Sequence, residues 1–349
     1  MDAAGEQLGE LKSRVEGASL PSGLKERVLV RIDQLTKLTE SPTFLPEFDR
    51  MNNYIDWIVN LPWEARTADQ LDLVRAREVL DSNHYGLVHI KDRVLEYMSV
   101  MKLKQEKGEG GDFMRAPILC FVGLVGTGKT TIAVSIAEAM GRRFARIPFG
   151  GMGDPLDLRG QSRMHPEAEP GKVIKSLRTT QSKNPVILLD EIDRVTDQGR
   201  ASIMGVLVEL LDPEQNNSFV DHYIDFPFDL SEALFIATAN NTRNIATAVL
   251  DRIEPIMMPS YTDEEKIVIG KKYMLPKILR KSGLPEGTVE IDDGVWSSVT
   301  RPLGYDAGIR TLERTIEGVV RKIARMLVEG KGNKFKITTE NVKEYLPKY

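Results

Sequence analysis

The chain has 349 residues, of which 41% are hydrophobic and 28% charged, and its formal net charge is −4. This composition is typical of a globular protein with more than one domain. The longest apolar runs have only the length of a strand, so we expect neither a membrane-spanning helix nor a signal peptide. The single cysteine, Cys120, excludes an internal disulfide and suits a reducing intracellular compartment. The acidic balance argues against nucleic acid as the primary partner.

Residues 1–66 are predicted to form a helical segment. The stretches 6–18 and 24–38 carry apolar residues at helical spacing, and a third helix is expected over 45–63. One face of this third helix is made of Phe48, Met51, Tyr54, Ile55 and Ile58. We interpret its aromatic residues as packing groups rather than as a ligand site, because aromatic side chains at helical spacing usually face a core.

The rest of the chain is organised around the stretch 117–131. A short apolar run predicts a buried strand over 117–122, a glycine-rich turn follows, and a helix is expected from Thr131 onward. Such a P-loop surrounds phosphates with backbone N–H groups, while its lysine reaches the terminal phosphates and its hydroxyl binds Mg²⁺. The residues expected to bind ATP or ADP are Gly123, Leu124, Val125, Gly126, Thr127, Gly128, Lys129, Thr130 and Thr131, with Thr130 also a magnesium ligand.

A second helical block, over 71–103, precedes this strand and is broken near residue 84. In P-loop ATPases the segment just before the first strand often supplies the adenine pocket. Candidates for contact with the base are therefore His84, Tyr85, Gly86 and Leu87. An ordinary helix-breaking turn explains the same residues equally well.

Two acids follow the next apolar run, over 185–189. Carboxyl ends of strands are where open α/β sheets bind ligands. Asp190 is expected to hold Mg²⁺, and Glu191 to activate the water that attacks the terminal phosphate. Acids commonly end strands at the surface, but the preceding P-loop favours the nucleotide role.

Two further polar residues are candidates for catalysis. Asn240 ends a third apolar run and is predicted to reach the γ-phosphate or the attacking water, with a simple turn asparagine as the alternative. Arg252 is predicted to stabilise transition-state charge at the nucleotide of an adjoining subunit. A salt bridge from Arg252 to Asp251 or Glu254 is the competing interpretation.

The order of these motifs closely resembles the ATPase module of the Lon family, the ATP-dependent serine proteases of the AAA+ superfamily. The resemblance runs from about residue 8 to Tyr349 and is carried by the P-loop, LLDEID, LLDPEQN, FPFDLS, FIATANN, LDRIE, YTDEEK and GIRTLER. It implies an α/β fold: an N-terminal helical segment (1–66), a three-layer AAA+ P-loop domain (67–257) and an all-helical lid (258–349).

The resemblance also implies a mechanism. A homohexameric ring would bind ATP and Mg²⁺ between neighbouring subunits and use hydrolysis to unfold polypeptides and pass them to a peptidase chamber. Lys129 would be the phosphate lysine and Asn240 the sensor 1 residue. Arg252 would be the arginine finger that acts on the neighbouring subunit, and Arg310, at the start of a long amphipathic helix, the sensor 2 residue.

Three departures from the family limit this transfer. The Ser/Lys peptidase domain and the globular N-terminal domain are not expected in this chain, which we interpret as an excised fragment. The P-loop reads GLVGTGKTT, without the two prolines usual in Lon. At the positions that grip substrate in the Lon pore, an aromatic, an aliphatic residue and glycine are replaced by His165, Pro166 and Glu167. We expect altered substrate preference or weaker pulling, unless Met152 or Met164 contacts substrate instead.

Two other functions stay open. ATP could gate the assembly of a chaperone-like ring with little hydrolysis, although Glu191 favours an active ATPase. A DNA-directed AAA+ ATPase is disfavoured by the sequence pI of about 5.8. For the compartment we suspect a peroxisomal Lon isoform, with the mitochondrial matrix or the bacterial cytoplasm as alternatives.

Overall fold

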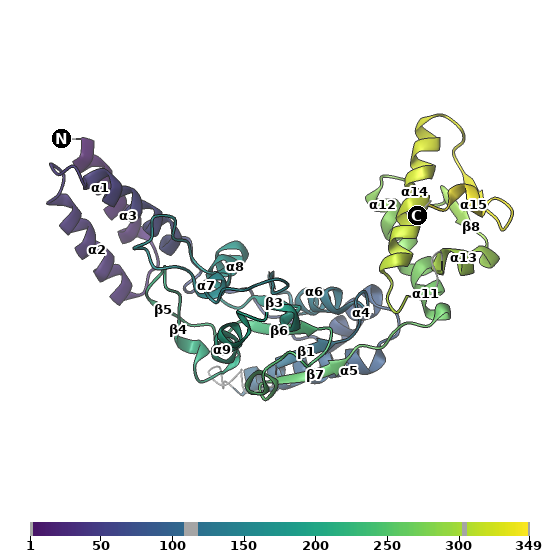
Figure 1. The fold of residues 1–349 in the computed structure, drawn as a ribbon, viewed down its shortest axis with the longest axis horizontal. Helices are drawn as coiled ribbons and strands as arrows, with labels where there is room; N and C mark the ends of the chain where they lie inside the picture. The colour runs from purple at the N-terminus through teal and green to yellow at the C-terminus, as the bar shows by residue number, and fades with distance from the viewer. Residues whose placement is uncertain (1–2, 108–117, 302–305, 348–349) are drawn as a thin grey trace. The chain divides into compact units, whose positions relative to one another are not determined.

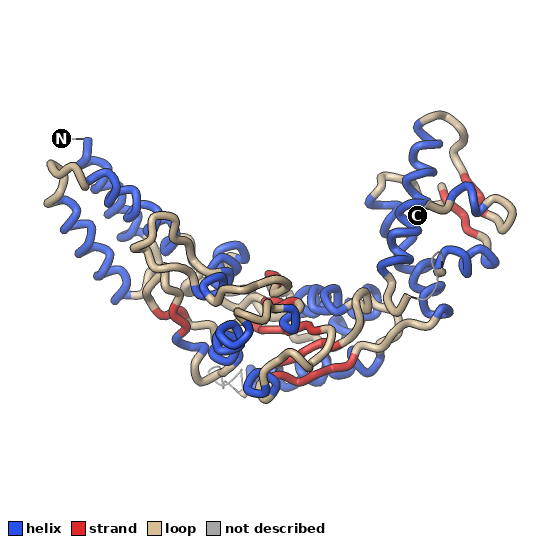
Figure 2. The backbone as a smooth tube through the Cα atoms, in the orientation of Figure 1, coloured by secondary structure: helices blue, strands red, loops and turns tan. Residues whose placement is uncertain are grey.

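The computed structural model describes residues 3–107, 118–301 and 306–347 (Figures 1 and 2). The chain divides into two compact units, whose boundary passes through two strands and two helices. The first unit consists of Met1–Leu71, Ser99–Cys120 and Met140–Pro255, and the second of Asp72–Met98, Phe121–Ala139 and Ile256–Tyr349. In the described part of the chain, no helix has both the length and the apolar character needed to cross a membrane.

Three helices form the N-terminal segment, as the sequence predicts. They are α1 (Ala3–Gly17), α2 (Ser22–Thr36) and α3 (Phe44–Val59), and they pack against one another (Figure 1). The predicted face of α3 is buried at Tyr54, Ile55 and Ile58, whereas Phe48 and Met51 are only partly covered.

The aromatic residues of this segment serve packing, as predicted. Trp63 stacks near Phe228 with ring centroids 4.9 Å apart. The guanidinium of Arg178 lies 4.1 Å from the centre of the Trp57 ring, and the hydroxyl of Tyr54 donates to a backbone carbonyl at 3.0 Å. These contacts engage all three aromatic side chains with other parts of the protein, which is the behaviour of packing groups.

A five-stranded sheet, with the order β2-β3-β6-β1-β7, forms the centre of the α/β domain. Its strands are β1 (Ile118–Val122), β2 (Phe144–Pro148), β3 (Val186–Asp190), β6 (Leu234–Ala239) and β7 (Ile253–Met257). β2, β3 and β6 run parallel, with Phe144 beside Val186 and Val186 beside Leu234. Every residue of β1, β3 and β6 is buried, which explains their unbroken apolar runs. Pro117, predicted to begin the first strand, lies outside the described residues.

Along the chain, helices and a short antiparallel strand pair precede and connect the strands of this sheet. The helix after the P-loop starts two residues earlier than predicted, at Lys129 rather than Thr131. The elements are α4 (Leu73–Asn83), α5 (Val88–Glu106), α6 (Lys129–Met140), α7 (Leu156–Arg159), α8 (Lys172–Thr180), η1 (Ile192–Arg194), α9 (Arg200–Leu211), η2 (Asn216–Ser218), β4 (Phe219–Val220), β5 (Pro227–Phe228) and α10 (Thr247–Leu250).

The C-terminal part of the second unit is mainly helical and has its own apolar core, centred on Trp296 and the inner face of α14. Its first helix begins with a side-chain cap, because Thr262 and Glu265 form a reciprocal capping box. A short parallel strand pair adds to the predicted helices. The elements are α11 (Asp263–Ile269), η3 (Gly270–Met274), α12 (Leu275–Lys281), β8 (Val289–Ile291), η4 (Asp293–Val295), α13 (Trp296–Thr300), α14 (Arg310–Val328), β9 (Phe335–Ile337) and α15 (Val342–Tyr345).

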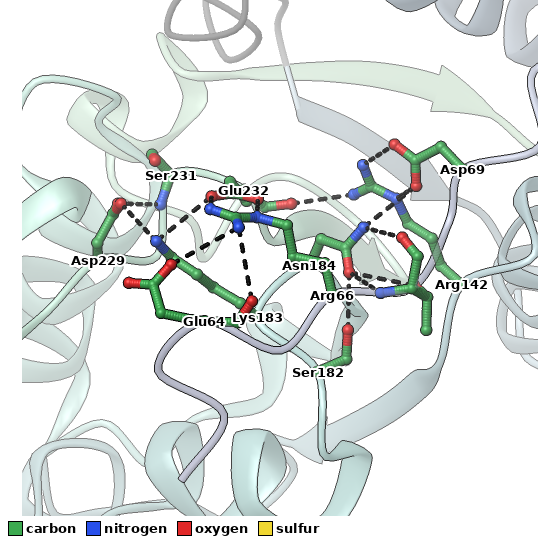
Figure 3. A network of polar contacts seen from close by, with 11 residues as sticks. Glu64, Arg66, Asp69, Arg142, Ser182, Lys183, Asn184, Asp229, Ser231 and Glu232 are labelled. Carbon is green, nitrogen blue, oxygen red and sulfur yellow. Dashed lines mark hydrogen bonds and ion pairs between the residues drawn. The ribbon is translucent and has the colours of Figure 1, made fainter. Parts of the chain in front are cut away.

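A polar network ties the segment after α3 to the amino ends of the strands (Figure 3). Arg66 pairs with both carboxylate oxygens of Glu232, at 2.6 and 2.7 Å. Arg142 pairs in the same two-bond manner with Asp69, at 2.7 Å for each bond, and the amide of Asn184 donates to Asp69 at 3.2 Å. Arg142, Asn184 and Glu232 directly precede β2, β3 and β6. The network therefore stabilises the amino ends of these strands, opposite to the carboxyl ends that carry the acids.

Candidate active site

The P-loop has the backbone that its glycines permit. Gly126 and Gly128 have φ values of 82° and 94°, in the left-handed region that other residues rarely adopt. At Gly123, an added Cβ would lie 2.8 Å from the Cβ of Met258, so that only glycine fits. The loop therefore turns tightly and leads directly into the N-terminus of α6, where backbone N–H groups and the helix dipole favour phosphate.

Lys129 turns its side chain back into the loop. Its ammonium group donates to the backbone carbonyls of Gly123 at 2.7 Å and Leu124 at 2.9 Å. The hydroxyl of Thr127 also donates to the Leu124 carbonyl, at 2.9 Å. Since Lys129 is only 7% exposed, its charge is held at the loop, as a phosphate-binding lysine requires.

Residues of the C-terminal helical part complete the surroundings of the loop within the same unit. The backbone N–H of Ile309 donates to the Gly126 carbonyl at 3.0 Å, and the side chain of Arg310 packs so close that a Cβ on Gly126 would lie 3.3 Å from it. The hydroxyl of Tyr261 donates to the Thr127 carbonyl at 3.3 Å. Arg310 itself is exposed, and the part of its side chain that lies next to Gly126 is the Cγ atom.

A cavity of about 760 Å³ opens beside the P-loop in this unit. It is lined by Gly128 and Thr131 of the loop, by His84 and Tyr85, and by residues of α11, η3, α12 and α14. Its volume suits a nucleotide-sized ligand. Three basic residues, Lys272, Lys277 and Arg280, and two acidic residues, Glu138 and Glu313, also line it.

The four residues predicted to contact adenine divide into two pairs. His84 and Tyr85 line the cavity, while Gly86 and Leu87 form the turn that follows, with φ values of 63° and 51°. The ring of Tyr85 meets that of Tyr273 edge-on, at 6.4 Å between centroids. An aromatic wall of this kind can stack against a base.

His84 is neutral in the folded chain. Its Nε2 atom lies 2.9 Å from the Ser135 hydroxyl, and its carbonyl accepts from Lys91 at 2.6 Å. Burial, followed by the positive charge of Lys91, lowers the pKa of His84 from 6.5 to about 4. The imidazole is thus already engaged with α6, and it forms a wall of the cavity.

The predicted catalytic acids lie in the first unit, at the end of β3. Asp190 is 3% exposed and both of its oxygens are bound. Oδ2 accepts from Arg146 of β2, at 2.8 Å from Nε, and Oδ1 accepts from the Thr238 hydroxyl at 2.5 Å. Glu191 has a φ of 60°, and its carboxylate lies 3.6 Å from the guanidinium of Arg194.

Asn240 follows β6 directly, on the strand next to the one that ends at Asp190. It is half-buried. Its neighbour Asn241 binds the buried carboxylate of Asp193, through its backbone N–H at 3.3 Å and its amide at 3.4 Å. This anchors the backbone at the position from which Asn240 projects.

Arg252 is held by an acid that the sequence analysis did not name. Its Nη2 atom lies 2.7 Å from Oδ2 of Asp212, and its Nη1 donates to the Ala248 carbonyl at 2.8 Å. The hydrogen bond from Arg252 lowers the pKa of the Asp212 carboxyl. Asp212 lies in the LLDPEQN motif, 40 residues before Arg252. Its place in that motif is the one signal in the sequence from which a role could have been predicted.

The stretch predicted to grip substrate is an exposed loop. His165, Pro166 and Glu167 are all exposed and line a hollow of about 550 Å³ together with His222. Arg163 secures the base of the loop, since its guanidinium lies 3.9 Å from the centre of the Tyr54 ring in α3. Met164 is also exposed, at 87%, whereas Met152 is buried.

Comparison with known proteins identifies the family of both parts. Residues 119–261 match the family described as "ATPase family associated with various cellular activities (AAA)", and residues 280–336 match "Lon protease AAA+ ATPase lid domain". "Lon protease" of Lawsonia intracellularis is 43% identical over 343 residues, which are 98% of this chain and 40% of that protein.

Two more relatives give the same result. "Lon protease 2" of Thermus thermophilus is 42% identical over 346 residues, 98% of this chain and 43% of its own length. "Lon protease" of Geobacter metallireducens is 41% identical over 345 residues, 99% of this chain and 41% of its own length. The chain thus spans about two fifths of these curated relatives.

Proposed function

The chain has an AAA ATPase domain followed by a Lon lid domain and corresponds to the ATPase part of Lon proteases, and from this we propose that it is an ATP-hydrolysing motor that unfolds and translocates polypeptides. The observation that carries the proposal is the P-loop, with Lys129 buried in it and a cavity of about 760 Å³ beside it. A nucleotide is the ligand that fits both features.

We assign the binding of phosphate and Mg²⁺ to the P-loop and to the acid at the end of β3. Residues 123–131 bind the phosphates of ATP, while Asp190 and the Thr130 hydroxyl hold Mg²⁺. Among the described residues, no three or more His, Cys, Asp or Glu side chains gather to hold a metal ion, but Mg²⁺ needs only one or two protein oxygens when phosphates and water supply the rest. The ion, when bound, neutralises charge on the phosphates.

Hydrolysis is assigned to Glu191 as the base that activates water. Asn240 orients that water or the γ-phosphate, and Arg310 contacts the phosphates from the lid. Arg252 acts on the nucleotide of a neighbouring subunit. This last role requires assembly, for which we propose a homohexameric ring with unfolded polypeptide as the substrate.

The loop with His165, Pro166 and Glu167 is the proposed contact for that polypeptide. Its exposure and the hollow that it lines support this role. The test is a His165→Tyr variant in the full-length protein, for which we expect a severalfold larger stimulation of ATPase activity by an unfolded substrate, with Lys334→Ala, a change in an exposed residue outside this loop, as the control. Unchanged stimulation and unchanged degradation would exclude a gripping role for His165.

The cellular compartment and the peptidase activity are proposals about the whole protein rather than about the ATPase part. The three relatives named above are bacterial proteins, and they add no support for a peroxisomal isoform. Degradation of substrates by a Ser/Lys peptidase would belong to the whole protein, of which this chain covers the ATPase part.

The experiment that tests the motor proposal measures ATP hydrolysis over a wide range of protein concentration, with light scattering for the mass of the assembly. We expect activity to rise cooperatively with concentration, to follow the formation of the ring and to disappear in Glu191→Gln but not in Glu340→Gln, which changes an exposed acid of the lid. Tight ATP binding by a ring without turnover would instead support a nucleotide-gated assembly.

A further inference from the structure

Thr238 is a polar residue in a strand that is otherwise apolar. The strand β6 has the sequence LFIATA, and all six residues are buried. Thr238 has no exposed surface. A buried hydroxyl destabilises a protein unless it forms hydrogen bonds, so the partners of Thr238 indicate what it does.

Both partners of Thr238 belong to the catalytic acids. Its hydroxyl donates to Oδ1 of Asp190 at 2.5 Å, and the same oxygen accepts from the backbone N–H of Glu191 at 2.8 Å. The direction of each bond is fixed, because an ionised carboxylate only accepts and a backbone N–H only donates. A hydroxyl, which does both, is therefore required at this position.

The sheet explains how one side chain reaches two consecutive acids. β3 and β6 are parallel and in register up to the pair Leu189 and Ala237, so the next residues along, Asp190 and Thr238, lie side by side on the same face. At Glu191 the chain leaves the sheet with a φ of 60°. A left-handed conformation is uncommon for a residue with a side chain, and the bond from Thr238 to its N–H holds it in place.

We propose that Thr238 is a positioning residue for hydrolysis, which orients the Asp190 carboxylate and fixes the backbone of Glu191 through its single hydroxyl. The inference rests on the proposed ATPase function and adds a third residue to the pair of acids. Arg146 holds the other oxygen, Oδ2, of Asp190. Thr238 differs from Arg146 in that its hydroxyl also accepts from the backbone N–H of Glu191.

The two bonds predict a specific defect when the hydroxyl is lost. Thr238→Val has nearly the same shape but neither bond, so Glu191 is free to shift. A displacement of about 1 Å at a reacting group can cost about 100-fold in rate. We expect kcat to fall about 10- to 100-fold while the KM for ATP changes less than about threefold, since the P-loop and the cavity are unaltered. Thr238→Ser, which keeps the hydroxyl, restores kcat to within about threefold of the parent.

A binding measurement without turnover provides a second readout. The affinity for fluorescent ADP is measured as a function of Mg²⁺ concentration, with Thr180→Val as the control for loss of a buried hydroxyl. Thr180 lies in α8, where its hydroxyl bonds only to carbonyls of its own helix, at 3.0 and 3.1 Å. In the parent, the affinity for ADP should change with Mg²⁺ concentration. We expect Thr238→Val to need a severalfold higher Mg²⁺ concentration to reach half of that change in affinity, and Thr180→Val to need the same concentration as the parent.

Thr238→Cys covers the case in which the valine variant does not fold. Cysteine differs from serine in one atom, and its thiol is larger than a hydroxyl and only a weak donor and acceptor, so we expect the kcat of Thr238→Cys to lie below that of Thr238→Ser by about tenfold at equal thermal stability. The inference is overturned if the parent hydrolyses ATP in a Glu191-dependent way and yet valine, cysteine and serine variants share its kcat. A parent without Glu191-dependent hydrolysis would instead contradict the proposed function.

Discussion

The phosphate loop and the acids at the end of β3 are held in their conformations by different groups. The loop in the second unit relies on its backbone: two glycines at positive φ, a helix N-terminus and a lysine bonded to carbonyls of the loop itself. The acids in the first unit depend on side chains from other strands, since Asp190 is held by Arg146 and Thr238. A backbone site binds phosphate whatever the surrounding side chains are, whereas an acid cluster is only as accurate as its partners. Binding and hydrolysis should therefore respond to different mutations.

Removal of the phosphate lysine should have the largest effect and should affect both functions. Lys129→Ala deletes the one ammonium group held within the loop. A hydrogen bond to a charged group contributes about 1.5–3 kcal/mol, so we expect ATP to bind about 10- to 100-fold more weakly. Fluorescent-nucleotide titration measures this, with Lys334→Ala, a change in an exposed lid residue, as the control. Unchanged affinity would show that the loop backbone alone binds phosphate.

Loss of the acid that holds Arg252, the proposed arginine finger, should affect hydrolysis alone. Asp212→Asn weakens the ion pair at 2.7 Å that orients Arg252, and we expect about a tenfold lower kcat, because orientation of a catalytic group is worth that much or more. The affinity for ATP should not change. The matched control is Asp251→Asn, an exposed acid adjacent to Arg252 in sequence. A larger defect in the control would contradict the assignment of Asp212.

A separate prediction concerns pH and the stability of the second unit. The folded-state pKa of His84 is about 4, against 6.5 for an unperturbed histidine. Between these values the unfolded chain binds a proton that the folded chain does not, so the contribution to stability is complete above pH 6.5 and is lost as the pH falls towards 4. It amounts to at most about 3 kcal/mol.

His84→Gln provides the comparison for this pH dependence, because glutamine does not titrate. We expect the melting temperature of the parent to fall more steeply than that of the variant between pH 7 and pH 4.5. Parallel curves for the two proteins would mean that burial of His84 does not disfavour its charged form.

The sequence predicted the P-loop and the buried strands because each is a local pattern: glycines at fixed spacing, or an apolar run. It did not predict the partners of the functional side chains. Arg252 with Asp212, and Thr238 with Asp190, join residues 40 and 48 positions apart, and no local pattern records such pairs. One signal was available for Thr238, as a lone hydroxyl in a strand buried throughout.

The most direct test of the account measures ATP binding and ATP hydrolysis on the same preparation of Glu191→Gln. Glutamine keeps the shape of Glu191 but cannot accept a proton from water. A general base contributes about 10²- to 10⁴-fold to a rate, so we predict a loss of that size in turnover and an affinity for ATP within about threefold of the parent. Turnover at the parental rate, or a loss of affinity in parallel with turnover, would contradict the separation of binding from hydrolysis.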